Sequence, residues 1–492
     1  MPIAYANFPY LSTILFSCVG GLLMILFIPA DKKNHIKWVS AVCSGITLAV
    51  SVYLFCAYDK TQGGLQFVEK FAWVPSMGIS YYNGADGFSI PMLLLTGIVF
   101  FTGVLTMWEL ENRVKEFFAL VFLLVAGVFG LFMSLDLFFI FVWYDVSLFP
   151  MYLLIAVWGS TRKEYGAMKL TLYLLAGSAL ILPAIVYLVV KSGLNTFDLV
   201  ALMQPGIFTP FQQKFAFILF YIGFGILAGV WPFHTWSPVG HVAAPTAVSM
   251  IHAGVLMKIG AFGVLRLGIF LCPQGWQYWA HLMALLATVG IVYGVFVGLS
   301  QTDIKYVIGY SSVSHMGIVG LGLATVTVDG LNGAVFQMFA HGVMTALFFS
   351  SVGYIYDKTH TKAIAELGGL SRIMPVATGY LILAALTGIG VPCLASFWAE
   401  LTVFISAFKV YPAYGTLAVC ALVVSALFIL RVVQRTCYGP ANERFAHLPD
   451  VGFGLGIPRM LLVSVIVFFG LFPSVMFDII RTASIPFMNG LP

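Results

Sequence analysis

Long runs of apolar residues, joined by short polar connections, make up almost the whole chain. Within a run such as 117–133, apolar residues follow one another without the period-two alternation that a membrane-spanning strand needs. A helix of about 20 apolar residues crosses the bilayer core and satisfies its own backbone hydrogen bonds there. The pattern therefore predicts an all-α fold, a polytopic membrane helix bundle. We expect about 14 transmembrane helices, over residues 10–30, 36–57, 88–107, 117–134, 137–158, 170–191, 214–231, 243–270, 277–299, 305–326, 331–356, 375–409, 414–437 and 460–480.

Two of these regions are interrupted in a way that predicts broken helices. Residues 231–238 contain two prolines, and the run 375–409 is nearly twice as long as one span and carries two glycines and Pro392 in its middle. Broken helices at corresponding places in two halves of a membrane protein point to a transport site. The alternative is that proline and glycine merely kink ordinary spans.

The composition supports a lipid environment. Of the 492 residues, 61% are hydrophobic and 9% are charged, whereas soluble domains carry roughly 25% charged residues. The net charge of +5 is spread along the chain, so we expect no nucleic acid partner. The seven cysteines are isolated, and neither a phosphate-binding loop nor a metal-ligand spacing occurs. The sequence therefore predicts no metal and no cofactor in this chain.

The distribution of basic residues predicts the orientation in the membrane. Sixteen of the 24 Lys and Arg residues fall in the odd-numbered connections, seven fall in the others or after the last span, and Lys258 lies inside a span. Cytoplasmic connections collect basic residues. We therefore expect a multi-pass protein of the inner (plasma) membrane of a prokaryote, with both termini on the outer side.

Three charged residues lie well inside predicted spans: Asp145, Lys258 and Glu400. A charge at the centre of a membrane helix costs at least about 2.5–3.5 kcal/mol, and such residues normally face the bundle interior or a hydrated cavity. An acid, a base and a second acid on three helices are typical of a proton relay. The alternative is static ion pairing, although three charges leave one without a partner.

Four histidines extend this series: His234, His252, His315 and His341. In one predicted helix Gln337, His341 and Thr345 share a face at four-residue spacing, and Ser311 and His315 do so in the helix before. Histidine is the side chain whose charge is most easily changed near neutral pH. Each histidine has an alternative as a hydrogen-bonded packing residue. A haem held by His315 and His341 is a further alternative, but the sequence offers no second pair for such a protein.

Several short motifs resemble one known family. They are Gln301-Thr302-Asp303-Ile304-Lys305, Ser312-Val313-Ser314-His315-Met316-Gly317, Pro150-Met151-Tyr152, Trp231-Pro232-Phe233-His234-Thr235-Trp236, Ala244-Pro245-Thr246 and Ala340-His341-Gly342. In their order along the chain these motifs resemble the antiporter-like subunits of respiratory complex I, an NADH:quinone oxidoreductase. Within that family the chain is most similar to the M type, which is subunit 4 in mitochondria. Related subunits occur in multisubunit sodium/proton antiporters and in membrane-bound hydrogenases.

The resemblance implies an organisation in two inverted five-helix repeats with broken helices. The repeats would occupy 117–270 and 271–437, after N-terminal helices at 1–116 and before a C-terminal loop and last helix at 438–492. It also implies a charged axis for protons. By position, Asp145 matches the family's glutamate of the fifth helix, Lys258 its central lysine, Glu400 its terminal glutamate, and His234, His315 and His341 its histidines.

The sequence departs from the family pattern at one important position. The family's lysine of the seventh helix lies seven residues before the histidine of the broken segment, and here that position is Leu227. In the family this lysine pairs with the acid of the fifth helix, which is shortened here to Asp145. The chain therefore lacks one proton site of the family, and Asp145 lacks the lysine with which it would pair.

From these observations we expect a proton-translocating, antiporter-like membrane subunit of a complex I-like assembly. It would be a non-catalytic subunit of a quinone oxidoreductase-type translocase, and its partners would be the bilayer and other membrane subunits, neighbouring antiporter-like subunits among them. The alternatives are a subunit of a cation/proton antiporter or of a membrane-bound hydrogenase, and a structural spacer that no longer pumps.

Overall fold

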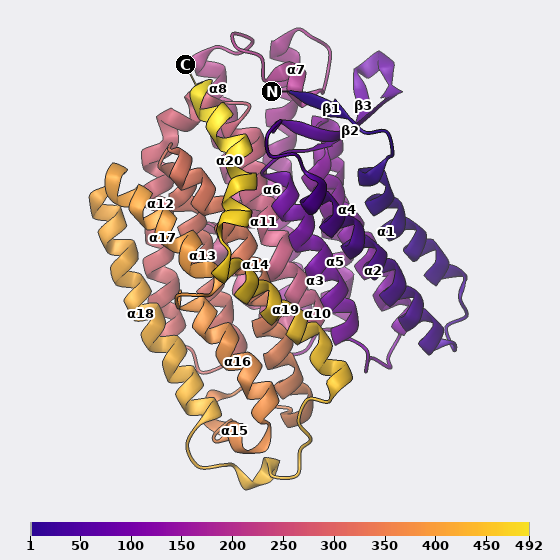
Figure 1. The fold of residues 1–492 in the computed structure, drawn as a ribbon, viewed down its shortest axis with the longest axis vertical. Helices are drawn as coiled ribbons and strands as arrows, with labels where there is room; N and C mark the ends of the chain where they lie inside the picture. The colour runs from indigo at the N-terminus through magenta and orange to yellow at the C-terminus, as the bar shows by residue number, and fades with distance from the viewer. Residues whose placement is uncertain (1, 492) are drawn as a thin grey trace.

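The chain folds as a bundle of long helices, described for residues 2–491 by a computed structural model (Figure 1). Thirteen helical segments in this part of the chain are long and apolar enough to cross a membrane. They are α1 (Tyr10–Phe27), α2 (Lys33–Ala57), α3 (Ser89–Thr106), α4 (Val114–Met133), α5 (Leu137–Trp158), α6 (Lys163–Ser192), the composite segment Pro210–Ala243, the composite segment Thr246–Ile269, α12 (Pro273–Ser300), α13 (Ile304–Ala324), α14 (Val328–Thr359), α18 (Pro412–Cys437) and α19 (Phe453–Leu471). The membrane helix bundle expected from the sequence is confirmed.

The remaining predicted span, 375–409, is a pair of shorter helices. Helix α16 (Pro375–Gly388) ends where Gly390 adopts a left-handed backbone with φ of 69°, and α17 (Ala395–Val410) begins after Pro392. Neither half is long enough to span a bilayer core by itself, since a helix rises about 1.5 Å per residue. Together the two halves occupy the place of the expected twelfth span. The interruption follows from the residues between them, because glycine tolerates that φ and proline cannot continue a helix.

The composite segment Pro210–Ala243 contains the other predicted break. Helix α8 (Pro210–Ala228) ends at Gly229, whose φ is 73°, and α9 (Trp236–Ala243) begins only after the short turn Phe233–Thr235. The composite segment Thr246–Ile269 follows as α10 (Thr246–Ile251), a π-helical turn η3 (His252–Leu256), α11 (Met257–Gly263) and a second π-helical turn η4 (Val264–Ile269).

Two helical segments form the centre of the bundle. In the most apolar part of α14 and of Thr246–Ile269 every residue is buried, whereas α1, α18 and α19 bury 39% of the corresponding stretch. The outer helices therefore present apolar side chains to lipid, and the central pair is surrounded by protein. Polar side chains on the central pair lie inside the molecule, which is where a functional polar group in a membrane protein is expected.

Two features were not expected from the sequence. A three-stranded sheet consists of β1 (Ile3–Tyr5), β2 (Leu65–Val74) and β3 (Ile79–Ala85), with β1 parallel and β3 antiparallel to β2. The predicted last span at 460–480 is instead α19 followed by a separate helix α20 (Ser474–Asn489). The sheet lies beside both chain termini at one end of the bundle, and α15 (Leu370–Ile373) and the 438–452 connection lie at the other (Figure 1).

Candidate functional site

Lys258 lies at the centre of the bundle, on α11 directly after the π-helical turn η3. Its ammonium group is fully buried and donates to the carbonyl oxygen of Ala253 within that turn. A π-helical turn widens the helix and changes which backbone groups pair, and such turns are frequent at functional sites. The local backbone therefore supplies an acceptor that holds the lysine without a carboxylate.

A short contact joins Lys258 to the second central helix. The Nζ atom of Lys258 lies 2.7 Å from Nδ1 of His341 on α14. The two helices approach closely here because glycines face each other: a Cβ added to Gly342 would lie 2.6 Å from the carbonyl oxygen of Gly254. Small residues at a crossing let membrane helices pack backbone to backbone. Lys258 and His341 can therefore share one proton directly.

His315, on α13, lies against His341. The two rings stack with their centroids 5.1 Å apart and an interplanar angle of 17°. The two ring planes are nearly parallel, and Nε2 of His341 has no hydrogen-bond partner in the described chain. Haem ligation by this pair would need the two rings on opposite faces of a porphyrin, and direct stacking leaves no room for one. Among residues 2–491 no group of three or more His, Cys, Asp or Glu side chains could hold a metal ion.

Nε2 of His315 finds its hydrogen-bond partners at the break between α16 and α17. Nε2 of His315 lies 3.1 Å from the carbonyl oxygen of Gly388, which ends α16, and 3.4 Å from Oε1 of Glu400 on α17. The last carbonyls of a helix have no partner within it, so the break leaves an acceptor at this point. Gln337 on α14 also donates to Oε1 of Glu400, at 3.1 Å.

Both ring nitrogens of His315 have oxygen atoms as neighbours. Nδ1 lies 2.7 Å from the carbonyl oxygen of Ser311, and Nε2 faces the Gly388 carbonyl and the carboxylate of Glu400. Nδ1 also lies 3.3 Å from the hydroxyl oxygen of Ser311, which can donate or accept a hydrogen bond. A neutral imidazole carries one N–H and an imidazolium carries two. Either protonation state of His315 therefore finds hydrogen-bond partners here, and the ring lies beside the carboxyl group of Glu400.

Asp145 lies apart from this row. It is half-buried on α5, and its Oδ1 accepts a hydrogen bond from Ser178 of α6 at 2.8 Å. No Lys, Arg or His nitrogen lies within 4 Å of its carboxylate in the part of the chain that the structure describes. Leu227, which stands where the family has a lysine, is buried on α8. Asp145 is therefore a carboxylate without a cation.

The remaining two predicted histidines are buried but lie outside the row. His234, in the turn between α8 and α9, packs against Tyr293 with ring centroids 4.8 Å apart. His252 stacks on Trp236 and lies 4.2 Å, between ring centroids, from His241. None of the ring nitrogens of His234, His241 and His252 has a hydrogen-bond partner among residues 2–491. His241 was not among the candidate residues found in the sequence, and its contact with His252 was not predicted.

The expectation that only three charged residues lie well inside spans was wrong. Arg266 is buried in η4, on the same composite segment as Lys258, and Arg459 is buried in α19. Arg266 lies four residues before the end of the predicted span 243–270, and Arg459 directly before the predicted span 460–480, so neither was counted as well inside a span. Arg459 donates from Nη2 to the carbonyl oxygen of Ser350, at 2.7 Å. The interior of the bundle therefore contains more charge than the sequence predicted.

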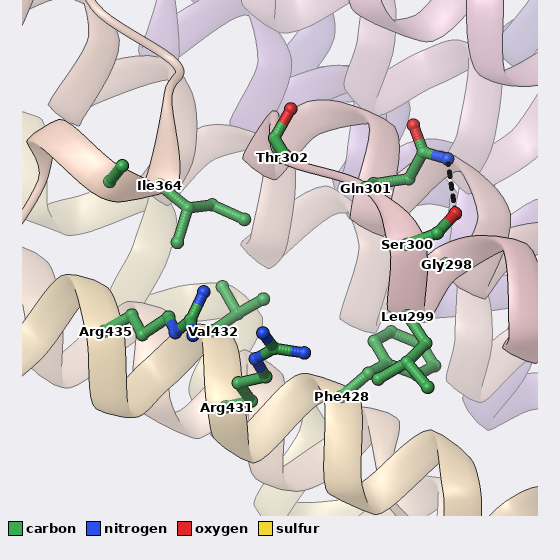
Figure 2. Close-up of a pocket in the computed structure, with 11 residues that line it drawn as sticks. Gly298, Leu299, Ser300, Gln301, Thr302, Ile364, Phe428, Arg431, Val432 and Arg435 are labelled. Carbon is green, nitrogen blue, oxygen red and sulfur yellow. Dashed lines mark hydrogen bonds between the residues drawn. The ribbon is translucent and has the colours of Figure 1, made fainter.

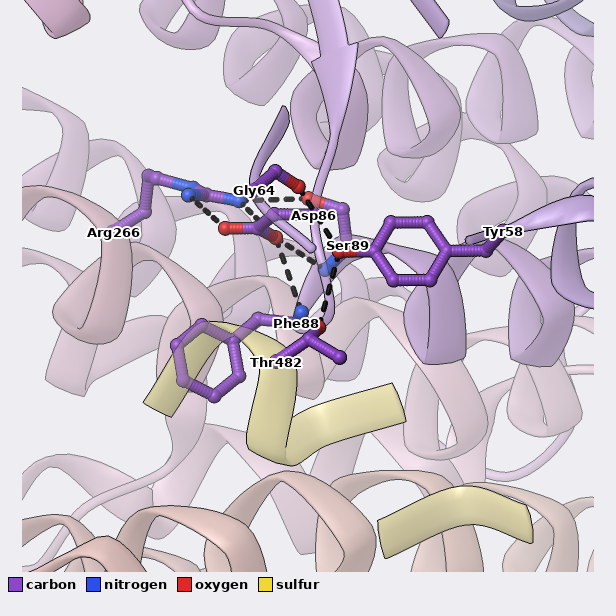
Figure 3. Close-up of polar contacts among 7 residues, drawn as sticks. All are labelled: Tyr58, Gly64, Asp86, Phe88, Ser89, Arg266 and Thr482. Atoms are coloured by element: carbon purple, nitrogen blue, oxygen red, sulfur yellow. Dashed lines mark hydrogen bonds and ion pairs between the residues drawn. The ribbon is translucent and has the colours of Figure 1, made fainter. Parts of the chain in front are cut away.

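Arg266 forms a buried, two-pronged ion pair with Asp86, which lies just before α3 (Figure 3). Nη1 and Nη2 of Arg266 lie 2.7 and 2.8 Å from the two carboxylate oxygens, and Nη2 also donates to Ser89 at 2.8 Å. Burial by itself raises the pKa of Asp86, but the charge and hydrogen bonds of Arg266 outweigh it and hold that pKa below its usual range. This ion pair links the start of α3 to the composite segment Thr246–Ile269, at the end of the bundle where the sheet lies.

The fold and the site together define a class: polytopic membrane proteins that carry a buried row of ionisable side chains through the middle of a helix bundle. Within that class, the chain belongs to the NADH:quinone oxidoreductase/Mrp antiporter transmembrane family, which matches residues 134–425. The resemblance found in the motifs is confirmed.

Curated relatives cover most of the chain. NADH-quinone oxidoreductase subunit M of Rickettsia conorii is 32% identical over 469 residues, which are 94% of this chain and 95% of that protein. NAD(P)H-quinone oxidoreductase chain 4 2 of Microcystis aeruginosa is 35% identical over 452 residues, which are 89% of this chain and 81% of the relative. The similarity to the M type, or chain 4, thus extends well beyond the short motifs.

Solved structures agree with this assignment. A chain of respiratory complex I from Thermus thermophilus superposes with a TM-score of 0.88 at 25% identity and covers 98% of this chain and 100% of its own. A chain of the Mrp complex from Dietzia sp. gives a TM-score of 0.87 at 20% identity, which shows a shared fold. The chain is an antiporter-like membrane subunit of complex I type.

Proposed function

We propose that this subunit moves protons through the row Lys258, His341, His315 and Glu400. The observation that carries the proposal is that the four side chains touch in sequence while all are buried, from the 2.7 Å contact of Lys258 and His341 to the 3.4 Å contact of His315 and Glu400. Each of the four can gain or lose a proton. Protons would pass along the row as the pairing between neighbours changes.

The driving force would come from electron transfer in other subunits. We propose that the chain assembles with further membrane subunits, neighbouring antiporter-like subunits among them, in a complex I-like quinone oxidoreductase of a prokaryotic plasma membrane. The names of the curated relatives support this assembly. In such a complex the chain would be a non-catalytic subunit without a redox cofactor. The absence of a cofactor remains a prediction.

The two broken segments support the proposed pair of inverted repeats. One break separates α8 from α9 within 117–270, and the other separates α16 from α17 within 271–437. In transporters built from repeats, discontinuous helices at corresponding positions surround the site near the middle of the membrane. Glu400, on the helix that follows the second break, would then be the member of the row nearest to an exchange point with water.

Replacing Glu400 tests the relay. Glu400→Gln keeps the size of the side chain but cannot ionise, so the ratio of protons moved to electrons transferred should fall by this subunit's share while assembly is retained. The measurement is proton uptake and electron transfer in vesicles that contain the complete complex. Glu366→Gln is the matched control, because Glu366 is an exposed glutamate in a connection. An unchanged ratio in an intact Glu400→Gln complex rejects the relay.

A structural spacer remains the second candidate, because the Asp145 side chain lacks its cation and Leu227 replaces a proton site. If the relay works without this acid, Asp145→Asn should change membrane-potential generation by less than about twofold, since Asp145 lies apart from the proposed row and contacts Ser178 instead.

Leu227→Lys should make Asp145 important again, because the carboxylate would then neutralise a buried cation. The comparison is membrane potential in assembled complexes that carry Asp145→Asn, Leu227→Lys or both changes. A loss of translocation in Asp145→Asn alone, with assembly intact, would show that Asp145 works in ionised form with a partner outside this chain.

A further inference from the structure

A cavity of about 290 Å³ opens at the end of the bundle opposite to the two termini (Figure 2). Its walls are the last turn of α12, residues 301–302 of the connection to α13, the short turn η5 (Ile364–Glu366) and one face of α18. The cavity lies well away from the row of buried charges, and no step proposed above uses it.

Two arginines of α18, Arg431 and Arg435, line this cavity. They are four residues apart and so lie on one face of the helix, one turn above the other. Figure 2 shows both guanidinium groups turned toward the space between α18 and the connection. Within residues 2–491 neither group lies within 4 Å of a carboxylate. Two positive charges therefore converge on a space without a negative partner.

The nearest acidic residues do not neutralise the two arginines. Asp303 follows the connection, but its carboxylate accepts the backbone N–H groups of Lys305 and Tyr306 and thereby caps α13. Glu366 lines a neighbouring hollow together with Arg435 and is exposed to solvent. The cavity itself is lined by no acidic side chain. It is suited to an anion.

Beside the arginines the surface is apolar. Leu299 and Phe428 line the cavity, and Leu427 and Leu430 of α18 are 62% and 46% exposed on the flank that faces away from the bundle. Arg435 lies two residues before the end of α18 at Cys437. In a helix that spans the bilayer, a residue this near the end lies at the depth of the polar headgroups. A polar, cationic space thus adjoins a lipid-facing apolar surface at the membrane boundary.

We propose that this cavity binds the headgroup phosphate of an anionic phospholipid, held by Arg431 and Arg435, with the acyl chains lying along α18. Guanidinium groups pair with phosphate oxygens through two parallel hydrogen bonds. Basic pockets between membrane helices are suited to anionic headgroups. The volume lies at the lower end of the roughly 300–1,000 Å³ of small-molecule pockets, which fits a headgroup but not a whole lipid.

Photolabelling of the complete complex tests the site. The complex is reconstituted in phosphatidylcholine vesicles that contain a minor fraction of phosphatidylglycerol with a photoactivatable acyl chain, and labelled peptides of α18 are quantified by mass spectrometry. Excess unlabelled phosphatidylglycerol should displace the label, whereas additional phosphatidylcholine or millimolar inorganic phosphate should not. This arm needs no variant and therefore does not depend on the stability of one.

The double variant Arg431→Gln, Arg435→Gln should weaken phosphatidylglycerol binding about thirtyfold, since each basic residue near an anionic headgroup contributes about fivefold. Arg372→Gln is the matched control, because Arg372 is an exposed arginine of α15 at the same end of the bundle but outside the cavity. It should bind like the wild type.

Four results would overturn the proposal. Displacement by inorganic phosphate would indicate a site for soluble anions, and equal displacement by phosphatidylcholine would indicate unspecific lipid contact. Unchanged labelling of the double variant would remove the role of the arginines. An unlabelled α18 in the wild-type complex would mean that a neighbouring subunit covers this face.

Discussion

At the scale of single residues, the charges that the sequence identified are those in the middle of long apolar runs. Lys258 and Glu400 could be found because an ionisable group is costly at that depth of a membrane helix and therefore rare. Arg266 and Arg459 were missed because a linear pattern cannot distinguish the end of a span from the start of a connection. No sequence pattern could predict that four side chains form a row in contact, since the row depends on how four helices pack. Its members are Lys258, His341, His315 and Glu400.

The pair Asp86 and Arg266 leads to a prediction about stability. Asp86→Asn leaves a buried guanidinium without its anion and should destabilise the protein by about 3–5 kcal/mol. The double change Asp86→Leu, Arg266→Met removes both charges and should cost much less. Denaturation midpoints of the purified complex in detergent provide the measurement. Equal losses for the single and double variants would contradict this account of the ion pair.

The same pair implies a direction for the pH dependence of stability. The pKa of Asp86 is lower in the folded protein than the value of about 3.9 expected after unfolding. Its contribution is therefore complete above that value and is lost as the pH falls through the folded pKa. Asp86→Asn should abolish this component of acid denaturation.

At the scale of helices, both breaks were predicted from glycine and proline, because these residues act through local backbone geometry. The sheet was not predicted, because strands β2 and β3 stabilise each other only after they pair. The π-helical turns on either side of α11 were not predicted either. No local propensity specifies them, and they follow from the packing of the central segment.

Gly390 connects the break of α16 and α17 to the site. Its φ is 69°, and a Cβ at this position would lie 2.7 Å from Oε2 of Glu400. Gly390→Ala should therefore lower the free energy of unfolding of the protein by at least about 1–2 kcal/mol. It should also displace the carboxyl group of Glu400, so proton translocation should fall.

Gly379→Ala is the matched control for this change. Gly379 lies inside α16, has no neighbouring atom within 4 Å of an added Cβ, and has a normal helical backbone. Alanine there should stabilise by about 0.5–1 kcal/mol. Thermal denaturation and proton translocation of both variants in the assembled complex separate strain at the break from a general effect of adding a methyl group.

At the scale of the whole molecule, the sixteen-to-seven distribution of basic residues predicts which end of the bundle faces the cytoplasm. In a variant without native cysteines, single cysteines at Asn34, Thr161 and His360 should react only with reagents on the cytoplasmic side. Cysteines at Thr61 and Gln204, exposed in connections of the other set, should react only from outside. Labelling of the first set from outside intact cells would reverse the orientation.

The stacked contact of His315 and His341 has a consequence for the leakage of protons across the membrane. An unbroken line of hydrogen bonds would conduct in both directions and discharge the gradient that the complex builds. Between stacked rings there is no donor aimed at an acceptor, so conduction has to wait until a ring turns or a water molecule enters. Such a contact does not conduct protons while the two rings keep their resting positions. If protons pass along the proposed row, leakage through the subunit is limited by how often a ring turns or a water molecule enters at this contact.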